Sequence, residues 1–229
     1  MTDLVVQVTD ASRVYDDEAV PVHALREVSL EVERGDFVSL AGPSGSGKST
    51  LLNVIGGLDR PTSGSVVVDG TDFGALTDAQ LADVRLHKIG FVFQAYNLIP
   101  VLSARENVEF ILQLQGVSAD ERRQRAQEML TLLGLEEMVD RRPAEMSGGQ
   151  QQRVAVARAI VSEPALLLAD EPSANLDSST TEDLLKLLRH LNENRGVTIV
   201  TATHDPLVMS YAKRRITLRD GQIDSDSAV

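Results

Sequence analysis

The sequence contains no cysteine and no tryptophan, and aromatic residues make up only 3% of its 229 residues. Without cysteine the chain can form no disulfide and no thiolate metal site, and it has no cysteine nucleophile. This composition is compatible with a cytosolic protein. Any role that needs an aromatic face, such as stacking on a nucleotide base, is restricted to a few candidate residues.

Long apolar runs are also missing. No stretch approaches the roughly 20 apolar residues that a membrane-spanning helix needs. The sequence shows no signal-peptide pattern of charge, apolar run and cleavage site. We therefore expect a cytoplasmic protein, and we expect any path across a membrane to lie on another polypeptide.

The chain has no excess of positive charge. It carries 22 Lys and Arg against 34 Asp and Glu, a formal net charge of −12 at pH 7. Proteins whose main partner is DNA or RNA usually present a basic face to the phosphate backbone. The basic runs here are short, and we interpret them as solvated faces or helix ends. We expect no nucleic-acid partner.

What the sequence does contain is a glycine-rich loop, Gly42-Pro43-Ser44-Gly45-Ser46-Gly47-Lys48-Ser49-Thr50. A mostly apolar strand-like run (36–41) precedes it and a helix-like run (49–55) follows, which is the context of a phosphate-binding P-loop. Backbone N–H groups and the helix N-terminus would hold the β-phosphate of ATP. Lys48 would reach the β and γ oxygens, and the Ser49 hydroxyl would bind Mg²⁺. The alternative is a plain glycine-rich turn.

Residues 165–171 form a continuous apolar run that ends in two carboxylates, Asp170 and Glu171. Such runs are typical of strands buried on both faces of a parallel sheet. Ligands bind beyond the carboxyl ends of these strands, so both carboxylates should lie near the phosphates. Asp170 suits the Mg²⁺ shell, and Glu171 suits a general base that activates water. The alternative is a solvated turn after a strand.

A second glycine-rich loop, Ser147-Gly148-Gly149-Gln150, lies about a hundred residues after the first. It opens a predicted helix over 150–161, whose residues Val154, Ala157, Ile160 and Val161 suit a buried face. A helix start with a serine and two glycines can donate several N–H bonds to a phosphate. An ordinary helix cap is the alternative. Two different phosphate-binding loops predict an ATPase that needs another copy of itself to complete its site.

Together these motifs resemble the nucleotide-binding domain of an ABC transporter, over nearly the whole chain. The run 147–153 resembles the family's signature loop, 170–171 its Walker B end and 173–177 its D-loop. Gln94, His204 and Tyr15 match the Q-loop glutamine, the switch histidine and the aromatic residue that stacks on adenine. The amino-acid sequences of residues 93–100 and 106–109 are most similar to those of ATPases of the MacB and LolD type, whose membrane partners export drugs or peptides or move lipoproteins.

The resemblance implies a role for each of these residues. Gln94 would contact Mg²⁺ or the attacking water and couple it to another lobe. His204 would donate to a γ-phosphate oxygen, with Asp205 and Pro206 starting the helix that follows. Tyr15 would stack on the base. The remaining histidines, His23, His87 and His190, have no such context, and we predict ordinary surface residues.

The resemblance also implies the fold: an α/β P-loop NTPase core with a mostly parallel sheet, an N-terminal antiparallel β subdomain and an inserted helical subdomain. We expect one domain over residues 1–229, with the helical part at about 95–160. Strand-like runs at 4–8, 28–32 and 65–68 predict the β-rich part around the base. Asp220-Gly221 predicts a tight hairpin and 224–229 a frayed polar tail.

The segment Tyr96–Leu102 is apolar without a helical or strand period. By resemblance it would receive a short cytoplasmic helix of an integral membrane permease. The alternative is packing within the helical subdomain.

The expected function is therefore an ATP-hydrolysing subunit that forms a homodimer around two ATP and drives a separate permease from the inner face of the cell membrane. One alternative is the same ATPase regulating a signalling or cell-wall-remodelling complex without cargo. An ABC ATPase of DNA repair or the ribosome would carry coiled-coil insertions, tandem halves or basic faces, which this sequence lacks. A binding module without catalysis disagrees with the complete set of hydrolytic residues.

Overall fold

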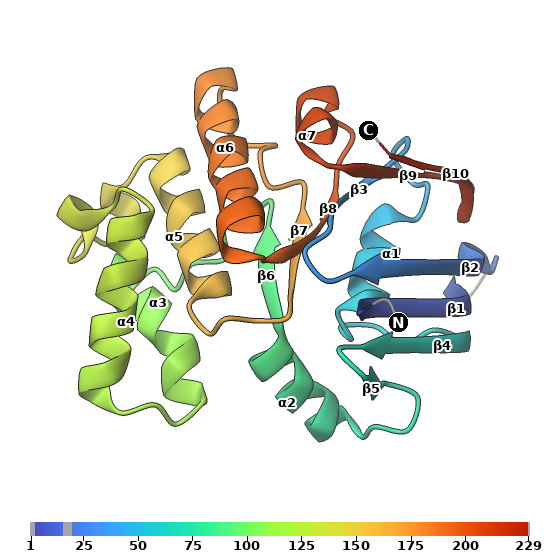
Figure 1. Cartoon of the computed structure of the whole chain (residues 1–229), viewed down its shortest axis with the longest axis horizontal. Coiled ribbons are helices and arrows are strands. Elements are labelled where there is room, and N and C mark those ends of the chain that lie inside the picture. The colour runs from blue at the N-terminus through green and yellow to red at the C-terminus, as the bar shows by residue number, and fades with distance from the viewer. Residues whose placement is uncertain (1–2, 16–19, 229) are drawn as a thin grey trace.

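The computed structural model describes residues 3–15 and 20–228, which form two sheets and a group of helices (Figure 1). The larger sheet has the strand order β10-β9-β3-β8-β7-β6. Its strands are β3 (Phe37–Ala41), β6 (Ile89–Phe93), β7 (Leu166–Asp170), β8 (Thr198–Ala202), β9 (Arg214–Arg219) and β10 (Gln222–Ala228). Every pairing in it is parallel except the one between β9 and β10. The predicted mostly parallel core is confirmed.

Alternate residues of these strands enter two separate hydrophobic cores. On β7, Leu166 and Leu168 belong to the core shared with the smaller sheet, whereas Leu167 and Ala169 belong to the core shared with the helices. Side chains alternate between the two faces of a strand, so a strand covered on both faces must be apolar throughout. This is why residues 165–169 show no alternation in the sequence.

The smaller sheet is antiparallel, in the order β2-β1-β4-β5. It consists of β1 (Leu4–Tyr15), β2 (Val22–Glu33), β4 (Ser63–Val68) and β5 (Thr71–Asp72). Helix α1 (Lys48–Ile55) contributes Leu51 and Ile55 to the core that both sheets share. The predicted N-terminal antiparallel subdomain is confirmed, and it holds the P-loop helix against the parallel sheet.

The helices gather mainly at the other end of the molecule (Figure 1). Between β6 and β7 the chain forms α3 (Ala104–Leu114), α4 (Ala119–Leu132), the short 3₁₀ turns η1 (Glu136–Met138) and η2 (Pro143–Glu145), and α5 (Gly148–Ile160). Ser103 and Glu106 form a capping box at the start of α3, whereas Ser118 caps α4 alone. The other helices are α2 (Asp78–Lys88), α6 (Ser178–Arg195) and α7 (Pro206–Tyr211). Within the described residues, no helix is long and apolar enough to cross a membrane.

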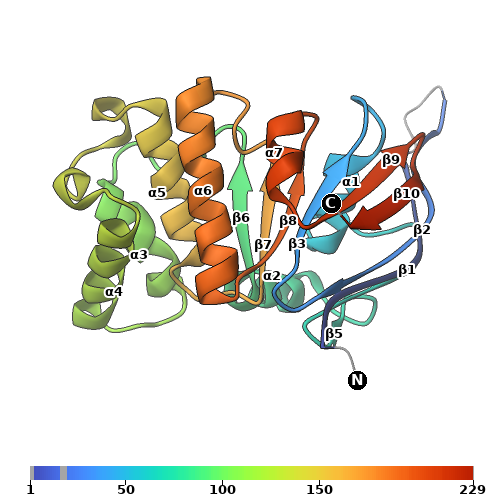
Figure 2. The same ribbon diagram turned by 45° about the horizontal axis from the view of Figure 1, so that its top comes forward.

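Figure 2 shows α5 and α6 standing beside the edge of the parallel sheet and the β9–β10 hairpin lying over the end of β1 and β2. Two expectations about boundaries were wrong. Helix α5 begins at Gly148 and not at residue 150, because Ser147 caps it and both glycines adopt the helical first turn. The tail predicted to be frayed is strand β10, paired to β9 as far as Ala228, and Val229 lies outside the described residues.

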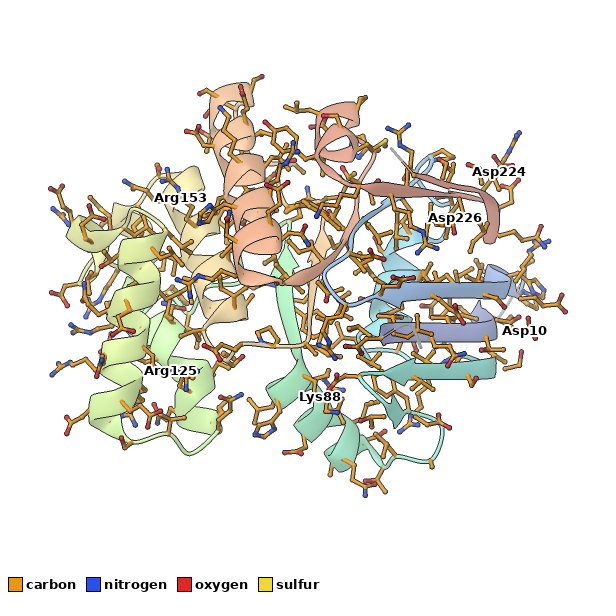
Figure 3. All side chains as sticks on the ribbon, in the orientation of Figure 1. Asp10, Lys88, Arg125, Arg153, Asp224 and Asp226 are labelled. Carbon is orange, nitrogen blue, oxygen red and sulfur yellow. The ribbon has the colours of Figure 1, made fainter. Side chains whose placement is uncertain are left out.

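An ion pair adds to the backbone pairing that makes this polar tail a strand. Arg214 on β9 binds both carboxylate oxygens of Asp226 on β10, at 2.8 and 2.6 Å, and it also donates to the Glu31 carbonyl on β2 at 2.7 Å. Asp226 and Asp224 are labelled on the β10 ribbon in Figure 3, which also labels Lys88 at the end of α2. Lys88 pairs with Asp69 at 3.0 Å and thereby ties α2 to the smaller sheet. Side-chain bonds of this kind are not visible in a sequence pattern.

Candidate functional site

The P-loop joins β3 to α1 and is supported from behind by the smaller sheet and the β9–β10 hairpin. At Gly47, where φ is +104°, an added Cβ would lie 2.6 Å from the Ala24 carbonyl oxygen, so only glycine fits. The hairpin residue Gly221 donates its N–H to the Ser46 carbonyl at 3.1 Å and accepts from the Arg26 N–H at 2.8 Å. The hairpin predicted at Asp220-Gly221 is confirmed, and it fixes the shape of the phosphate-binding loop.

Lys48, the first residue of α1, is nearly buried, and its ammonium group turns back over the loop. Its Nζ donates to the carbonyl oxygens of Gly42 and Pro43 at 2.8 and 2.9 Å. A cation held over a glycine-rich loop, at a helix N-terminus, is a suitable arrangement for a phosphate.

Asp170 ends β7 beside the start of α1. Its Oδ1 accepts a hydrogen bond from the Ser49 hydroxyl at 3.0 Å. Burial raises the pKa of Asp170, and the neighbouring carboxylate of Glu171 acts in the same direction, whereas the bond from Ser49 and the charge of Lys48 oppose it. A hydroxyl oxygen and a carboxylate oxygen this close together are ligands of the kind that Mg²⁺ prefers.

Glu171 adopts a left-handed backbone conformation, with φ of +45°. Its N–H is held by the Ala202 carbonyl at 2.9 Å, and its carboxylate accepts from Thr203 at 3.2 Å. His204 Nδ1 lies 2.7 Å from Glu171 Oε1. Because a carboxylate can only accept, Nδ1 carries the hydrogen of this bond. Local strain of this kind is common where a side chain must be aimed at a reaction.

Of these groups, Lys48, Ser49, Glu171 and His204 border one open cavity of about 770 Å³. Several residues of the loop line it, and so do the aromatic, amide, carboxylate and imidazole groups singled out in the sequence. The lining residues predicted to act are Tyr15, Pro43, Ser44, Gly45, Gly47, Lys48, Ser49, Thr50, Gln94, Glu171 and His204. Gly42, Ser46 and Asp170 do not line it, although Asp170 bonds Ser49, which does. The cavity is lined by a lysine and a glycine-rich loop together with an aromatic ring, a combination that suits a nucleoside triphosphate.

The second glycine-rich loop lies elsewhere. Ser147 caps α5 in a capping box with Gln150, and within the described part of the chain neither residue lines the cavity. An added Cβ on Gly149 would lie 2.3 Å from Thr180 Cγ2, and one on Gly148 would lie 2.7 Å from the Tyr96 hydroxyl. Close packing against α6 therefore requires glycine at 149, whereas the atom nearest to Gly148 is the end of the Tyr96 side chain, which can move aside.

Direct hydrogen bonds connect the two regions. Asn175 donates its side-chain amide to the Gln94 carbonyl at 3.0 Å. Gln152 on α5 donates to the Pro172 carbonyl at 2.6 Å. Arg158, also on α5, donates to the carbonyls of Asn97 and Tyr96 at 2.6 and 3.1 Å. A displacement of α5 must therefore move the segment after Gln94 as well.

The segment Tyr96–Leu102 agrees in part with each of the two expectations, packing within the helical subdomain and contact with another protein. Leu98 is partly buried against the core of the helical part, which is the packing alternative. Val101 has 71% of its surface exposed, which leaves an apolar contact point for another protein.

Some residues at the cavity were not predicted. His23, expected to be an ordinary surface residue, is exposed but lines the cavity beside Val22 and Ala24. Arg13 and Asp59 contact Tyr15. A sequence signal existed for Arg13, because residues two apart in a strand share a face and the aromatic candidate is Tyr15. Asp59 follows a helix end with no such pattern. His87 and His190 are exposed, as expected.

Comparisons with known proteins agree with this geometry. The model of the ABC transporter family matches residues 25–174. The chain is 50% identical to a macrolide export ATP-binding/permease protein, MacB, of Syntrophobacter fumaroxidans over 224 residues, which are 97% of this chain and 31% of that protein. It therefore spans about a third of the length of that relative. It is 46% identical to the uncharacterized ABC transporter ATP-binding protein MJ0796 of Methanocaldococcus jannaschii, covering 96% of each chain.

A solved structure shows the same fold. The dimeric ATP-binding cassette MJ0796, in a post-hydrolysis state bound to ADP and Pi, superposes with a TM-score of 0.90 at 45% identity, covering 97% of this chain and 98% of that one.

Proposed function

The chain belongs to the ABC transporter family as an ATP-binding cassette with ATPase activity, and from that premise we propose that two copies share two ATP molecules and drive a separate membrane subunit. One observation carries the proposal. The cavity brings together Tyr15, Lys48, Gln94, Glu171 and His204, while the loop at Ser147 lies outside it. The cavity therefore contains only one of the two phosphate-binding loops, and the Ser147 loop of a second copy of the chain would complete it.

ATP would lie along this cavity with its phosphates at the P-loop. Its β- and γ-phosphate oxygens would replace the two carbonyl oxygens that Lys48 now contacts. The remaining contacts would come from backbone N–H groups of Ser44 to Thr50 and the N-terminus of α1. Ser49 and Asp170, with Gln94, would hold Mg²⁺, which when bound neutralises charge on the phosphates. The net charge of −12 means that local geometry, and not a general positive field, would hold the anion.

Hydrolysis would depend on Glu171 and His204. The Glu171 carboxylate accepts a proton from the attacking water while its hydrogen bond with His204 fixes its direction. With Nδ1–H directed at Glu171, the ring donates to a γ-phosphate oxygen through Nε2 only when it is an imidazolium. Gln94 orients the water. Asn175 donates to its backbone carbonyl, so a movement of Gln94 on loss of the γ-phosphate would also move Asn175.

In the dimer, Ser147 to Gln150 of one copy would contact the γ-phosphate held by Lys48 of the other. Oriented N–H groups at the start of α5 then act where other ATPases use an arginine finger. The dimeric state reported for the MJ0796 structure supports this arrangement.

The membrane subunit is inferred from the relatives. MacB of Syntrophobacter fumaroxidans combines an ATP-binding and a permease part in its name, and this chain matches 31% of it. We place the protein at the cytoplasmic face of the membrane, with the exposed Val101 and its neighbours at the contact. Identification of the subunit that copurifies from solubilised membranes would separate transport from regulation of a signalling complex.

Lys48→Ala tests the nucleotide site directly. The variant should lose ATP binding and ATPase activity, because it loses the charge that faces the phosphates. Lys186→Ala is the matched control, since Lys186 is an exposed lysine on α6 whose salt-bridge partner among the described residues is Glu182. Unchanged ATP affinity in Lys48→Ala, measured by calorimetry, would contradict the proposal.

A further inference from the structure

Tyr15, at the end of β1, belongs to a cluster of three side chains beside the cavity, together with Arg13 and Asp59. The Tyr15 hydroxyl donates to Asp59 Oδ2 at 2.7 Å. Arg13 Nε donates to the same oxygen at 2.8 Å. The guanidinium carbon of Arg13 lies 4.4 Å from the centre of the Tyr15 ring. The hydroxyl and one face of the ring are therefore both occupied.

The Asp59 carboxylate accepts hydrogen bonds on both of its oxygens. Its other oxygen, Oδ1, accepts the Arg60 backbone N–H at 2.8 Å. Burial opposes ionisation, but the hydrogen bonds from Tyr15, Arg13 and the Arg60 backbone outweigh it and lower the pKa of Asp59. A charged acceptor makes shorter and stronger hydrogen bonds than a neutral one, so the tyrosine hydroxyl is firmly held.

Asp59 is also fixed to the phosphate end of the site. Its backbone N–H, and that of Leu58, bond the Asn53 carbonyl near the end of α1, at 3.2 and 2.8 Å. Helix α1 begins with Lys48. One rigid helix therefore connects the lysine that faces the phosphates to the carboxylate that holds the aromatic ring.

We propose that Asp59 and Arg13 are positioning residues for nucleotide binding, which hold Tyr15 with its second face presented to the base of ATP. The inference rests on the proposed ATP site. Arg13 covers one face of the ring by a cation–π contact and Asp59 prevents rotation, so the ring is ordered before the base arrives. A ring that is already ordered loses less conformational freedom on binding.

A purely structural role for the cluster predicts something different. Val14 and Thr62 also join β1 to the loop after α1, through a hydrogen bond of 3.0 Å to the Thr62 hydroxyl. If Asp59 and Arg13 merely strengthen this junction, their loss lowers stability and weakens every ligand of the P-loop alike. If they position Tyr15, their loss weakens only ligands that carry a base.

The experiment compares ATP with inorganic tripolyphosphate, which has the phosphates and no base. Affinities of both would be measured by calorimetry for wild type, Asp59→Ala, Arg13→Gln and Tyr15→Phe, with thermal unfolding as a check on folding. Loss of a base stacked on an aromatic side chain weakens binding roughly five- to 150-fold. Partial loss of this stacking in Asp59→Ala should weaken ATP roughly three- to tenfold, since the ring remains but is no longer fixed.

Tripolyphosphate affinity should stay the same in all three variants. Tyr15→Phe should weaken ATP binding as much as Asp59→Ala does. The double variant Tyr15→Phe/Asp59→Ala should lose no more ATP affinity than either single variant, because both changes break the same bond between the Tyr15 hydroxyl and Asp59. Asp59→Asn, which keeps an oxygen acceptor, should recover part of the affinity. Asp78→Asn is the control, since it removes an exposed partner of Arg60 and leaves Tyr15 untouched.

Equal weakening of ATP and tripolyphosphate in Asp59→Ala, or no weakening of either, would overturn the inference. Failure of this inference can be distinguished from failure of the proposed function, which Lys48→Ala tests. If Lys48→Ala loses both ligands while Asp59→Ala retains both, the nucleotide site stands and the positioning role fails. If Lys48→Ala retains both ligands, the nucleotide site itself fails.

Discussion

Glu171→Gln should nearly abolish ATP hydrolysis while leaving the fold and ATP binding intact. The substitution keeps the length of the side chain, and an amide oxygen can still accept from His204 or Thr203, which now lie 2.7 and 3.2 Å from the two carboxylate oxygens. Only the ability to accept a proton from water is lost. A positioned general base contributes about 10²–10⁴ in rate, which corresponds to about 3–5 kcal/mol of activation free energy.

The assay is phosphate release in a single turnover, with ATP affinity and thermal unfolding measured on the same samples. Glu163→Gln is a matched control, because Glu163 is an exposed glutamate with a similar left-handed backbone, φ of +55°, and does not line the cavity. The control should hydrolyse ATP at the wild-type rate. If Glu171→Gln retained clearly more than about a hundredth of the activity, the loss would lie below the range for a general base and the assignment would be refuted.

Two further variants test the signature loop and the C-terminal strand. Gly149→Ala should lower stability by about 1–3 kcal/mol and reduce ATPase activity, because its Cβ would lie 2.3 Å from Thr180 Cγ2; Thr180→Ser removes that methyl group and should rescue both, and failure of the rescue in urea unfolding would exclude the steric cause. The bond from Arg214 outweighs burial and lowers the pKa of Asp226, so this pair should stabilise the fold above the ordinary carboxyl pKa of about 4 and lose its effect as pH falls through the lowered pKa. Near neutral pH the free energy of unfolding of wild type should therefore exceed that of Asp226→Asn by less than about 1 kcal/mol, since the pair is partly exposed. A difference in unfolding free energy that grows on acidification would contradict the predicted direction of the pH dependence.

The sequence predicted the parts of the site that depend on backbone geometry. A P-loop between a strand and a helix leaves few alternatives for where Lys48 and Ser49 lie. Likewise, an apolar run that ends in Asp170 and Glu171 must place them at the carboxyl edge of a parallel sheet. Both predictions depend on the pattern of apolar residues and on the positions of glycines, and both can be seen directly in the local sequence.

The parts that it did not predict depend on contacts between distant side chains. Asp59 meets Tyr15 across 44 residues of chain, and Arg214 meets Asp226 in a segment with no apolar pattern. The polar composition of the last residues indicated a frayed end, although cross-strand pairing with β9 overrides such a preference. The early start of α5 has a similar origin, because the serine cap and packing against Thr180 compensate for two glycines in the first turn.

The claim on which this account depends is that one ATP is held between the P-loop of one copy and the Ser147 loop of another. Sedimentation velocity of the Glu171→Gln protein, with and without ATP and Mg²⁺, tests it most directly. We expect monomers without nucleotide and dimers with ATP, and we expect that adding Ser147→Arg to the same protein returns the monomer while ATP still binds. A protein that stays monomeric with saturating ATP at high concentration would contradict it.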